Sequence, residues 1–409
     1  MHKKHTKATV ITHILSALLV LNACSNEPTT SHEVVDMHQG TTTQDMDQSK
    51  DLDDTQEPDA HQDAQPDTTD MAQDMADQGN TAVTADTIFA QYATLSTIAG
   101  TALISDKGVN GWKPEFEGAD ATTAELSRPH IALANTAGEV FIADKDAHAI
   151  RKVSTDGTIS TFAGTGVAGS TSDESTPATS SKLSSPNGLW INSNGTVYVL
   201  DLGNDRVVKV DEQGMMTTLF RIGGAGAGRG LWVSDDESLA YISAGTILKT
   251  WTPEQGVTTL ASGFSSLGNL HVSPSGQLAV TDRGGSKAYL IDKNGEKTHI
   301  AGTGSGRDAD TGMLALEAGL DEVRGIWFHP QGGYFLATHK GGQIWYVDTQ
   351  GVLHRFIHGD KDDDHAGDGE PFNSSGKKIS EPRAVTMTPS GEVLITEHDG
   401  GYIRLVSKK

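Results

Sequence analysis

The sequence predicts an all-β fold, a six-bladed β-propeller of four-stranded antiparallel blades. From residue 87 onward, short β-branched and apolar runs alternate with glycine-containing turns, and no helical periodicity appears. Six segments of this part are similar to one another at a spacing of about 40 residues plus insertions. Because each segment holds four short runs, the repeat is typical of a propeller.

Each unit begins with a short strand, and the six opening segments align with one another. They are Pro129–Ala132, Pro186–Trp190, Arg229–Trp232, Gly268–His271, Arg324–Trp327 and Pro382–Val385. A polar turn such as Asn192–Gly195 leads to the second strand, for example Val197–Asp201. A third strand such as Arg206–Val210 and a fourth such as Ile159–Ala163 complete the unit.

The two ends of the chain are predicted to meet in one blade. The last unit ends at Lys409 after only three strands, whereas Leu95–Gly100 repeats the fourth-strand pattern ahead of the first unit. We therefore expect the N-terminal strand to complete the sixth blade, which leaves no open sheet edge in the ring.

Three parts of the unit carry a family resemblance. The Pro186–Leu189 start, the Tyr198–Val207 centre and the Ala163–Gly166 end resemble NHL repeats, over roughly residues 92 to 409. The resemblance implies the propeller fold but no particular activity, since such folds host many functions. It also implies that Arg206 acts as a structural clamp.

Residues 1–23 read as an export signal. A basic start with Lys3, Lys4 and Lys7 precedes an apolar run from Ala8 to Leu21, which is too short for a spanning helix. The following Leu21–Cys24 tetrad resembles a bacterial lipobox, which implies cleavage before Cys24 and its acylation. The alternative is an ordinary signal peptide with a stray thiol. Cys24 is the only cysteine, so no internal disulfide forms.

Residues 24–86 are predicted to be a disordered acidic linker that tethers the propeller, residues 87–409, to a membrane. After Cys24 this segment contains 16 acidic residues, one lysine (Lys50) and no aromatic residue. Such a composition buries too little apolar surface to fold. Ser25 after the cysteine resembles the sorting pattern of outer-membrane lipoproteins, which implies the outer membrane of the cell envelope, with the propeller in the periplasm or at the surface. The net charge of −23 argues against nucleic-acid binding.

Four long insertions connect the fourth strand of one blade to the first strand of the next. They are 101–127, 165–184, 303–322 and 359–380. Connections of this kind lie on one face of a propeller, where we expect the binding surface. The partner predicted there is a protein, a glycan or a small anionic ligand, and the propeller itself is expected to be a monomer.

On the same face, the residues that open the first strands are predicted to ring the channel mouth. This collar consists of His130, Asn187, Arg229, Asn269, Arg324 and Arg383. Its three arginines suit a carboxylate, a phosphate or an acidic sugar. Alternatively, the arginines pair with the acidic residues that end the second strands, which are Asp144, Asp201, Asp282 and Glu397.

The remaining motifs point away from catalysis. Trp190, Trp232 and Trp327 share one column of the repeat, which predicts packing between blades. The sequence holds no zinc-type spacing, nucleophile elbow or P-loop. Asp360–Glu370 is acid-rich but lacks the glycine of an EF-hand loop, so no cofactor is predicted, with calcium as the open alternative.

We therefore expect a membrane-tethered binding module and not an enzyme. The alternative is a metal-dependent lactonase or lyase with its site at the channel mouth, as similarity to other six-bladed propellers implies. His130, Asn187, Asn269 and His271 could then hold the metal, although the collar arginines would repel a cation.

Overall fold

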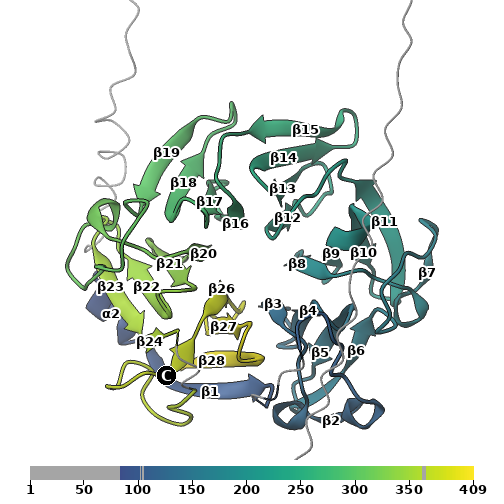
Figure 1. The fold of residues 1–409 in the computed structure, drawn as a ribbon, viewed down its shortest axis with the longest axis horizontal. Helices are drawn as coiled ribbons and strands as arrows, with labels where there is room; N and C mark the ends of the chain where they lie inside the picture. The colour runs from purple at the N-terminus through teal and green to yellow at the C-terminus, as the bar shows by residue number, and fades with distance from the viewer. Residues whose placement is uncertain (1–82, 102, 104–105, 362–364) are drawn as a thin grey trace, which may run out of the picture. The chain divides into compact units, whose positions relative to one another are not determined.

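The computed structural model describes residues 83–101, 103, 106–361 and 365–409, all of which belong to the second of two compact units, Thr69–Lys409. The predicted signal, Cys24 and most of the predicted linker lie outside the described residues. Six antiparallel blades form a ring around a central channel, so the predicted fold class is confirmed (Figure 1). Among the helices of this part, none has the length and apolar character that a membrane span requires.

The first strand of each blade lies at the channel and the fourth lies at the rim (Figure 1). Blade 1 contains β3 (Pro129–Ala134), β4 (Val140–Asp144), β5 (Ala149–Val153) and β6 (Thr158–Ala163). Blade 2 contains β8 (Pro186–Ile191), β9 (Val197–Asp201), β10 (Arg206–Val210) and β11 (Met215–Arg221). Blade 3 contains β12 (Leu231–Val233), β13 (Ala240–Ala244), β14 (Ile247–Thr252) and β15 (Gly256–Ala261).

The other half of the ring repeats this order. Blade 4 contains β16 (Leu267–Val272), β17 (Leu278–Asp282), β18 (Lys287–Ile291) and β19 (Lys297–Ala301). Blade 5 contains β20 (Val323–Phe328), β21 (Tyr334–Thr338), β22 (Gln343–Val347) and β23 (Leu353–Ile357). Blade 6 contains β26 (Pro382–Met387), β27 (Val393–Glu397), β28 (Tyr402–Lys408) and β1 (Tyr92–Ala99). The second strands are continuously apolar because a neighbouring blade covers each of their faces.

The predicted closure of the ring is confirmed. Strand β1 pairs with β28 in antiparallel register, with Leu95 opposite Val406 and Thr97 opposite Arg404. The N-terminal strand thus supplies the fourth strand of the last blade, and the ring has no gap between its first and last blades.

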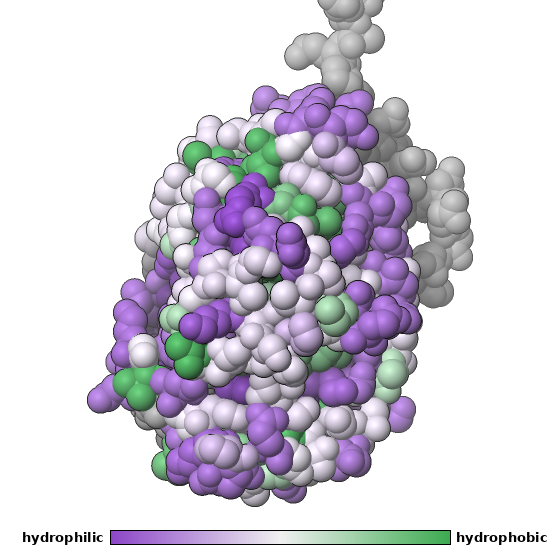
Figure 2. Space-filling view, turned by 90° about the vertical axis from the view of Figure 1, so that its right-hand side faces the viewer, coloured by the Kyte–Doolittle hydropathy of each residue, from purple (hydrophilic) through white to green (hydrophobic). Residues whose placement is uncertain are grey.

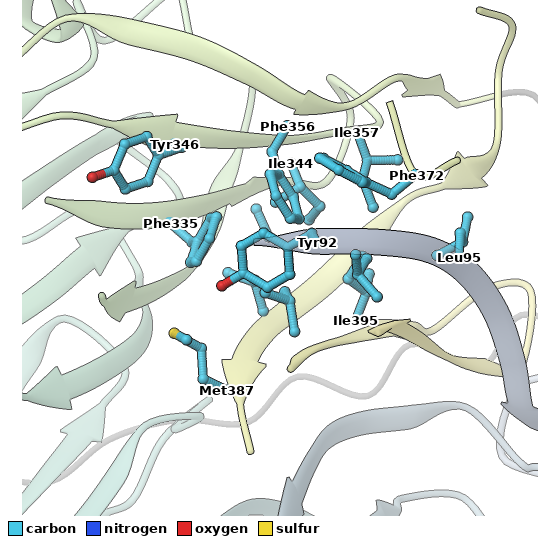
Figure 3. Packing of buried hydrophobic residues seen from close by; sticks show 14 of the residues in the cluster. Tyr92, Leu95, Phe335, Ile344, Tyr346, Phe356, Ile357, Phe372, Met387 and Ile395 are labelled. Carbon is cyan, nitrogen blue, oxygen red and sulfur yellow. The ribbon is translucent and has the colours of Figure 1, made fainter. Parts of the chain in front are cut away.

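A core cluster between blades 5 and 6 anchors this closing strand (Figure 3). The Tyr92 ring lies 5.2 Å from that of Phe356, centroid to centroid, in an edge-to-face contact. Helix α2 (Ala85–Phe89) adds Ile88, which is fully buried, and Phe89, whose ring lies 5.3 Å from Phe356. The ordered fold therefore begins within the segment predicted as linker, before residue 87, because these apolar residues bury against the core.

The insertions differ from the expectation that they stack on one face, because each also runs along the rim of the following blade. Strand β2 (Ala119–Asp120) pairs with β6, and β7 (Thr176–Pro177) pairs with β11. In the third insertion Leu314 bridges to Val352, the residue before β23, and in the fourth Asp368 bridges to Leu95 of β1. Four blades thus have a covered outer edge, which a sequence repeat alone does not indicate.

Short elements within the connections complete the fold. They are β24 (Gly359–Asp360) and β25 (Ile379–Ser380), which pair in parallel, and the 3-10 helices η1 (Pro114–Phe116), η2 (Ala121–Thr123), η3 (Ala178–Ser180), η4 (Leu202–Asn204) and η5 (Ala315–Glu317). Figure 2 shows the rim on the side of β7 and β11, where hydrophilic residues dominate and apolar residues lie in small separate groups. This part of the rim has the mixed polarity of an ordinary solvent-exposed surface.

Candidate functional site

Local backbone geometry turns the collar residues toward the channel mouth. In four blades the residue before the first strand has a left-handed φ: Arg128 (62°), Ser185 (50°), Glu322 (54°) and Glu381 (44°). The strand then pairs with the end of the second strand, and the register slips by one residue. In three blades the slip falls on the collar residue itself, which is Asn187, Arg324 or Arg383. Such bulges re-aim a side chain.

The structure brings together most of the predicted collar. The Nη1 atom of Arg229, two residues before β12 of blade 3, lies 3.1 Å from Nδ1 of His130 in β3 of blade 1. Asn187 donates its amide N–H to the carbonyl of Gly228, next to Arg229. Asn269 is also buried, at 7% exposed, but the described hydrogen bonds do not join its side chain to the others.

A second set of side chains joins the collar, and sequence reasoning missed it. It consists of Arg128, Arg283, Glu322, His339, His398 and Asp399, and together with the collar we call it the mouth cluster. Arg128 and Glu322 precede first strands, whereas the other four directly follow the ends of β17, β21 and β27. The signal that could have found them is positional, since connections between second and third strands share this face.

Ion pairs occupy only part of the positive charge in the mouth cluster. Arg324 donates to Glu322 at 2.8 Å, and Arg383 lies 3.6 Å from Asp399. Arg128 donates to the same Asp399 at 2.6 Å. Arg229 differs from these, since no carboxylate of the described residues lies within ion-pair distance of it.

The alternative pairing, in which the collar arginines hold the acids that end the second strands, is wrong. Other buried arginines take most of those carboxylates: Arg151 lies 3.3 Å from Asp144, Arg206 lies 2.9 Å from Asp201, and Arg404 lies 3.2 Å from Glu397. Backbone N–H groups also donate to these carboxylates, and the hydrogen bonds that Asp282 accepts within the described residues all come from the backbone. The predicted clamp role of Arg206 is confirmed, because its side chain and that of Asp201 are both 0% exposed.

The mouth cluster leaves several buried donors without a partner. In the described part of the chain, hydrogen bonds are missing at Nε of Arg229, Arg283 and Arg383, at Nε and Nη1 of Arg324, and at Nε2 of His130. Buried polar groups are normally satisfied, so each of these atoms marks a place where a ligand would gain a hydrogen bond. Five of these six atoms are guanidinium nitrogens, and they belong to four arginines whose charges act on one another.

The pKa shifts show how closely these cations face one another. Burial, followed by the charges of Arg383, Arg324 and Arg283, holds the pKa of Arg229 well below its usual range. Burial and the charge of Arg324 lower the pKa of Arg383 to about 9. Burial likewise lowers the pKa of His130 and His398, so both imidazoles are neutral at pH 7. The cluster therefore combines crowded positive charge with neutral imidazoles.

The acidic side chains of the mouth do not fit a cation well. One ligand atom from each of His339, Glu381 and Asp399 lies within 4.8 Å of the others, which is compact enough for a metal. However, Asp399 already accepts from Arg128 at 2.6 Å and faces Arg383 at 3.6 Å. A metal would have to displace both guanidinium groups, so this donor set suits its arginine partners better.

Two acids of the predicted calcium alternative are engaged elsewhere. Asp368 pairs with the buried Arg404 at 2.8 Å, and Glu370 pairs with the buried Lys378 at 2.7 Å. Residues 362–364 of that segment lie outside the described residues.

The predicted packing of the tryptophan column between blades is confirmed. Trp190, Trp232 and Trp327 each pack against a core cluster that two neighbouring blades share. All three are only partly buried, and the Trp190 ring also contacts the rings of Trp232 and Trp327 at the opposite end of the channel.

The ring of six four-stranded antiparallel sheets defines the protein as a six-bladed β-propeller. Residues 88–210 match the family model described as the Teneurin NHL domain, which confirms the predicted repeat. Among curated proteins, none matches the sequence.

Several solved structures share the fold at low sequence identity. A protein of unknown function from Bacteroides thetaiotaomicron is 18% identical with a TM-score of 0.62, over 78% of this chain and 76% of that one. An auxiliary nutrient binding protein from the same organism is 12% identical with a TM-score of 0.58, over 78% and 77%. A gluconolactonase from Xanthomonas campestris is 12% identical with a TM-score of 0.52, over 81% and 96%. These similarities establish the propeller fold.

Proposed function

We propose that this chain is an extracytoplasmic binding module, held at the cell envelope through Cys24, whose mouth cluster binds the carboxylate or phosphate group of a small ligand. The observation that carries the proposal is the set of buried, unpartnered guanidinium N–H groups on arginines that face one another. An anion would satisfy these donors and relieve the repulsion among the cations.

The surroundings of the cluster support binding over catalysis. His130 and His398 pack edge to face, with ring centroids 4.6 Å apart, and His398 Nδ1 bonds to the carbonyl of Pro129 at 3.1 Å. These contacts hold the imidazoles in place as neutral hydrogen-bonding groups. A fold shared with nutrient binding proteins is compatible with this role.

A titration of the full chain tests the proposal. Citrate, phosphate and glucuronate are the probes, and glucose is the uncharged comparison for glucuronate. The variant Arg229→Ala/Arg324→Ala/Arg383→Ala should lose binding by several orders of magnitude, since each charge-assisted contact contributes about 1.5–3 kcal/mol. A control with the same change in net charge replaces the exposed Arg221, Lys293 and Arg307 with alanine and should bind as the parent chain does. Equal loss in both triple variants, or no anion bound by the parent, would overturn the proposal.

The second candidate is a metal-dependent hydrolase or lyase at the same mouth, favoured only by the compact His339, Glu381 and Asp399 set. Metal analysis of the purified chain separates the two. A stoichiometric divalent ion, lost in Asp399→Asn, would support the enzyme. Anion binding that persists in the presence of a chelator would support the binding module.

A further inference from the structure

The channel has a second opening, at the C-terminal ends of the six first strands. A cavity of about 510 Å³ lies there. Every blade contributes to its wall, through Leu133, Trp190, Trp232, His271, Trp327 and Met387 in order around the ring. We call this cavity the aromatic cup. It lies at the opposite end of the strands from the mouth cluster, so neither the predicted collar nor the proposed anion site uses it.

The aromatic rings of the cup form a continuous floor. The centroid of Trp190 lies 6.1 Å from that of Trp232 and 6.2 Å from that of Trp327, at interplanar angles of 54° and 33°. His271 stacks on Trp327 with centroids 3.7 Å apart. At these separations the rings are in direct contact with one another. No group can enter between them, so a ligand has to lie on the floor. Rings in contact favour a flat surface over an aromatic cage, in which separated rings enclose a cation.

His271 supplies a directed donor within this floor. Burial lowers the pKa of His271 to about 3, so the imidazole is neutral at pH 7. Its Nδ1 atom accepts a hydrogen bond from the backbone N–H of Phe328 at 3.1 Å. The single proton of the ring therefore resides on Nε2. No hydrogen bond among the described residues uses this Nε2–H, although His271 is only 5% exposed. The cup thus holds a donor, on a largely buried side chain, that a ligand oxygen could satisfy.

The rim of the cup is polar but carries no positive charge. Ser234, Asp235, Ser273 and Thr388 lie around the floor, and the described residues that line the cavity include no lysine or arginine. Asp235 uses Oδ1 to accept from the backbone of Ser193 at 3.0 Å and is otherwise exposed. The cup therefore offers hydroxyl and carboxylate groups around an apolar floor, which disfavours the anions that suit the mouth cluster.

We propose that the aromatic cup binds an uncharged pyranose ring. One face of such a ring carries C–H groups that pack on an aromatic surface, while its edge carries hydroxyl groups. The tryptophan floor meets the C–H face, the Nε2–H of His271 donates to a ring hydroxyl, and the carboxylate of Asp235 accepts from another. A flat aromatic ligand would use the floor alone and leave the His271 donor unsatisfied.

An adjoining groove indicates that the ligand is longer than one sugar. This second cavity, of about 590 Å³, shares Ser273, Pro274, Phe328 and Pro330 with the cup. It extends between blades 4 and 5 past Leu314 and Leu316, which are 46% and 49% exposed. A neutral oligosaccharide can place one ring on the tryptophan floor and the next along this groove.

Tryptophan fluorescence of the full chain reads out binding, since three of the six tryptophans line the cup. The probes are glucose, N-acetylglucosamine, cellobiose and maltose, with indole as the flat aromatic comparison. We expect a saturable change with a saccharide, tighter for a disaccharide than for its monosaccharide. Trp327→Ala should abolish binding, as measured by calorimetry, and the matched control Trp112→Ala, on the first insertion, should retain it.

Two substitutions of His271 separate the hydrogen bond from the packing. Asparagine places an amide oxygen near the position of Nδ1 and removes the outer donor, whereas glutamine reaches the position of Nε2 and keeps a donor there. His271→Asn should weaken saccharide binding at least tenfold and His271→Gln by much less, provided that thermal melts show both to be folded. A cup that binds indole but no saccharide, or saccharide binding that survives Trp327→Ala, would overturn the inference. The anion triple variant should bind saccharide normally, so failure here is distinguishable from failure of the proposed function.

Discussion

The two mouths of the channel are built by the same six strands, yet their chemistry is opposite. In three blades a collar residue and a tryptophan lie three positions apart, which is about 10 Å along a strand. These pairs are Asn187 and Trp190, Arg229 and Trp232, and Arg324 and Trp327. At one end, guanidinium groups crowd one another with unpartnered donors. At the other, aromatic rings form a floor without a cation. Two positions of the same repeat, three residues apart, can therefore give the two ends of the channel different chemistry.

A second contrast separates two kinds of buried arginine. Arg206 and Arg404 pair closely with carboxylates that are themselves fully buried, and they fix the connections between strands. Arg229 is buried beside three other guanidinium groups without a carboxylate at ion-pair distance in the described part of the chain. The first kind stabilises the fold, whereas we expect the second kind to lower stability until an anion binds.

We expect the largest effect from a deletion that unfolds the propeller and therefore destroys both channel mouths. Deleting residues 25–101 takes away β1, with Tyr92 and Leu95, and leaves the edge of β28 open. Each lost core side chain of this size costs about 3–5 kcal/mol, which approaches the whole stability of a typical domain. We expect unfolding or aggregation. Deleting only 25–82 should leave the melting temperature unchanged, and equal melting temperatures for the two deletions would contradict the closure.

The next effect tests the clamp arginines. Arg206→Met leaves Asp201 buried without its cation and should lower the free energy of unfolding by about 3–5 kcal/mol. Urea denaturation of the full chain measures this. The exposed Arg221→Met, whose side chain is 58% exposed, serves as the control and should change stability by less than about 1 kcal/mol. A small effect for Arg206→Met would mean that the carboxylate relaxes toward water.

Acid should destabilise both ends of the channel. The pKa values of His130 and His398 at one mouth and of His271 at the other lie below the ordinary value of 6.5. As the pH falls below about 6.5, these histidines become protonated in the unfolded chain but stay neutral in the folded chain. Each such histidine then reduces the free energy of unfolding by about 1.4 kcal/mol per pH unit. For His271 this loss continues down to about pH 3.

Asp144 and Asp201 act in the opposite direction, because burial raises their pKa values, to about 6 for Asp144. Their folded forms take up protons first and gain stability as the pH falls. The histidine contribution is therefore read from a variant: His271→Gln should reduce the slope of unfolding free energy against pH between pH 6 and 4. An unchanged slope would mean that His271 is protonated in the folded state.

The smallest effect on the propeller concerns the anchor. Cys24→Ser should move the protein from the membrane fraction to the soluble fraction, because the acylated cysteine is the predicted membrane attachment. Binding at both mouths should be unchanged. Membrane association that persists after carbonate washing would contradict the lipoprotein prediction.

The sequence predicts the fold well because the same pattern of four strands recurs in six segments. The Pro186–Trp190 segment and its counterparts identify the first strands, and the unmatched Leu95–Gly100 identifies the closing strand. The position of the collar follows from the same alignment. These features are local or periodic, so they can be recognised in one sequence without related sequences.

The rest of the candidate site depends on contacts between blades. Glu322 and Asp399 reach the mouth only because connections from different blades converge there, and no spacing in the sequence reports this. The sequence alone does not decide which arginine pairs with Asp201, because both Arg206 and the collar arginines are possible partners. The direction of Trp190 depends on a register slip at Asn187, which only the paired strands reveal.

The most direct test of the central claim is the melting temperature of Arg229→Met with and without citrate. Without an anion, removing this guanidinium relieves repulsion from Arg283, Arg324 and Arg383, so the variant should melt at or above the temperature of the parent chain. With saturating citrate, the parent should gain stability and the variant should gain much less. A variant that is strongly destabilised without citrate, together with a parent that citrate does not stabilise, would show that Arg229 is part of the architecture and that the mouth cluster is not an anion site.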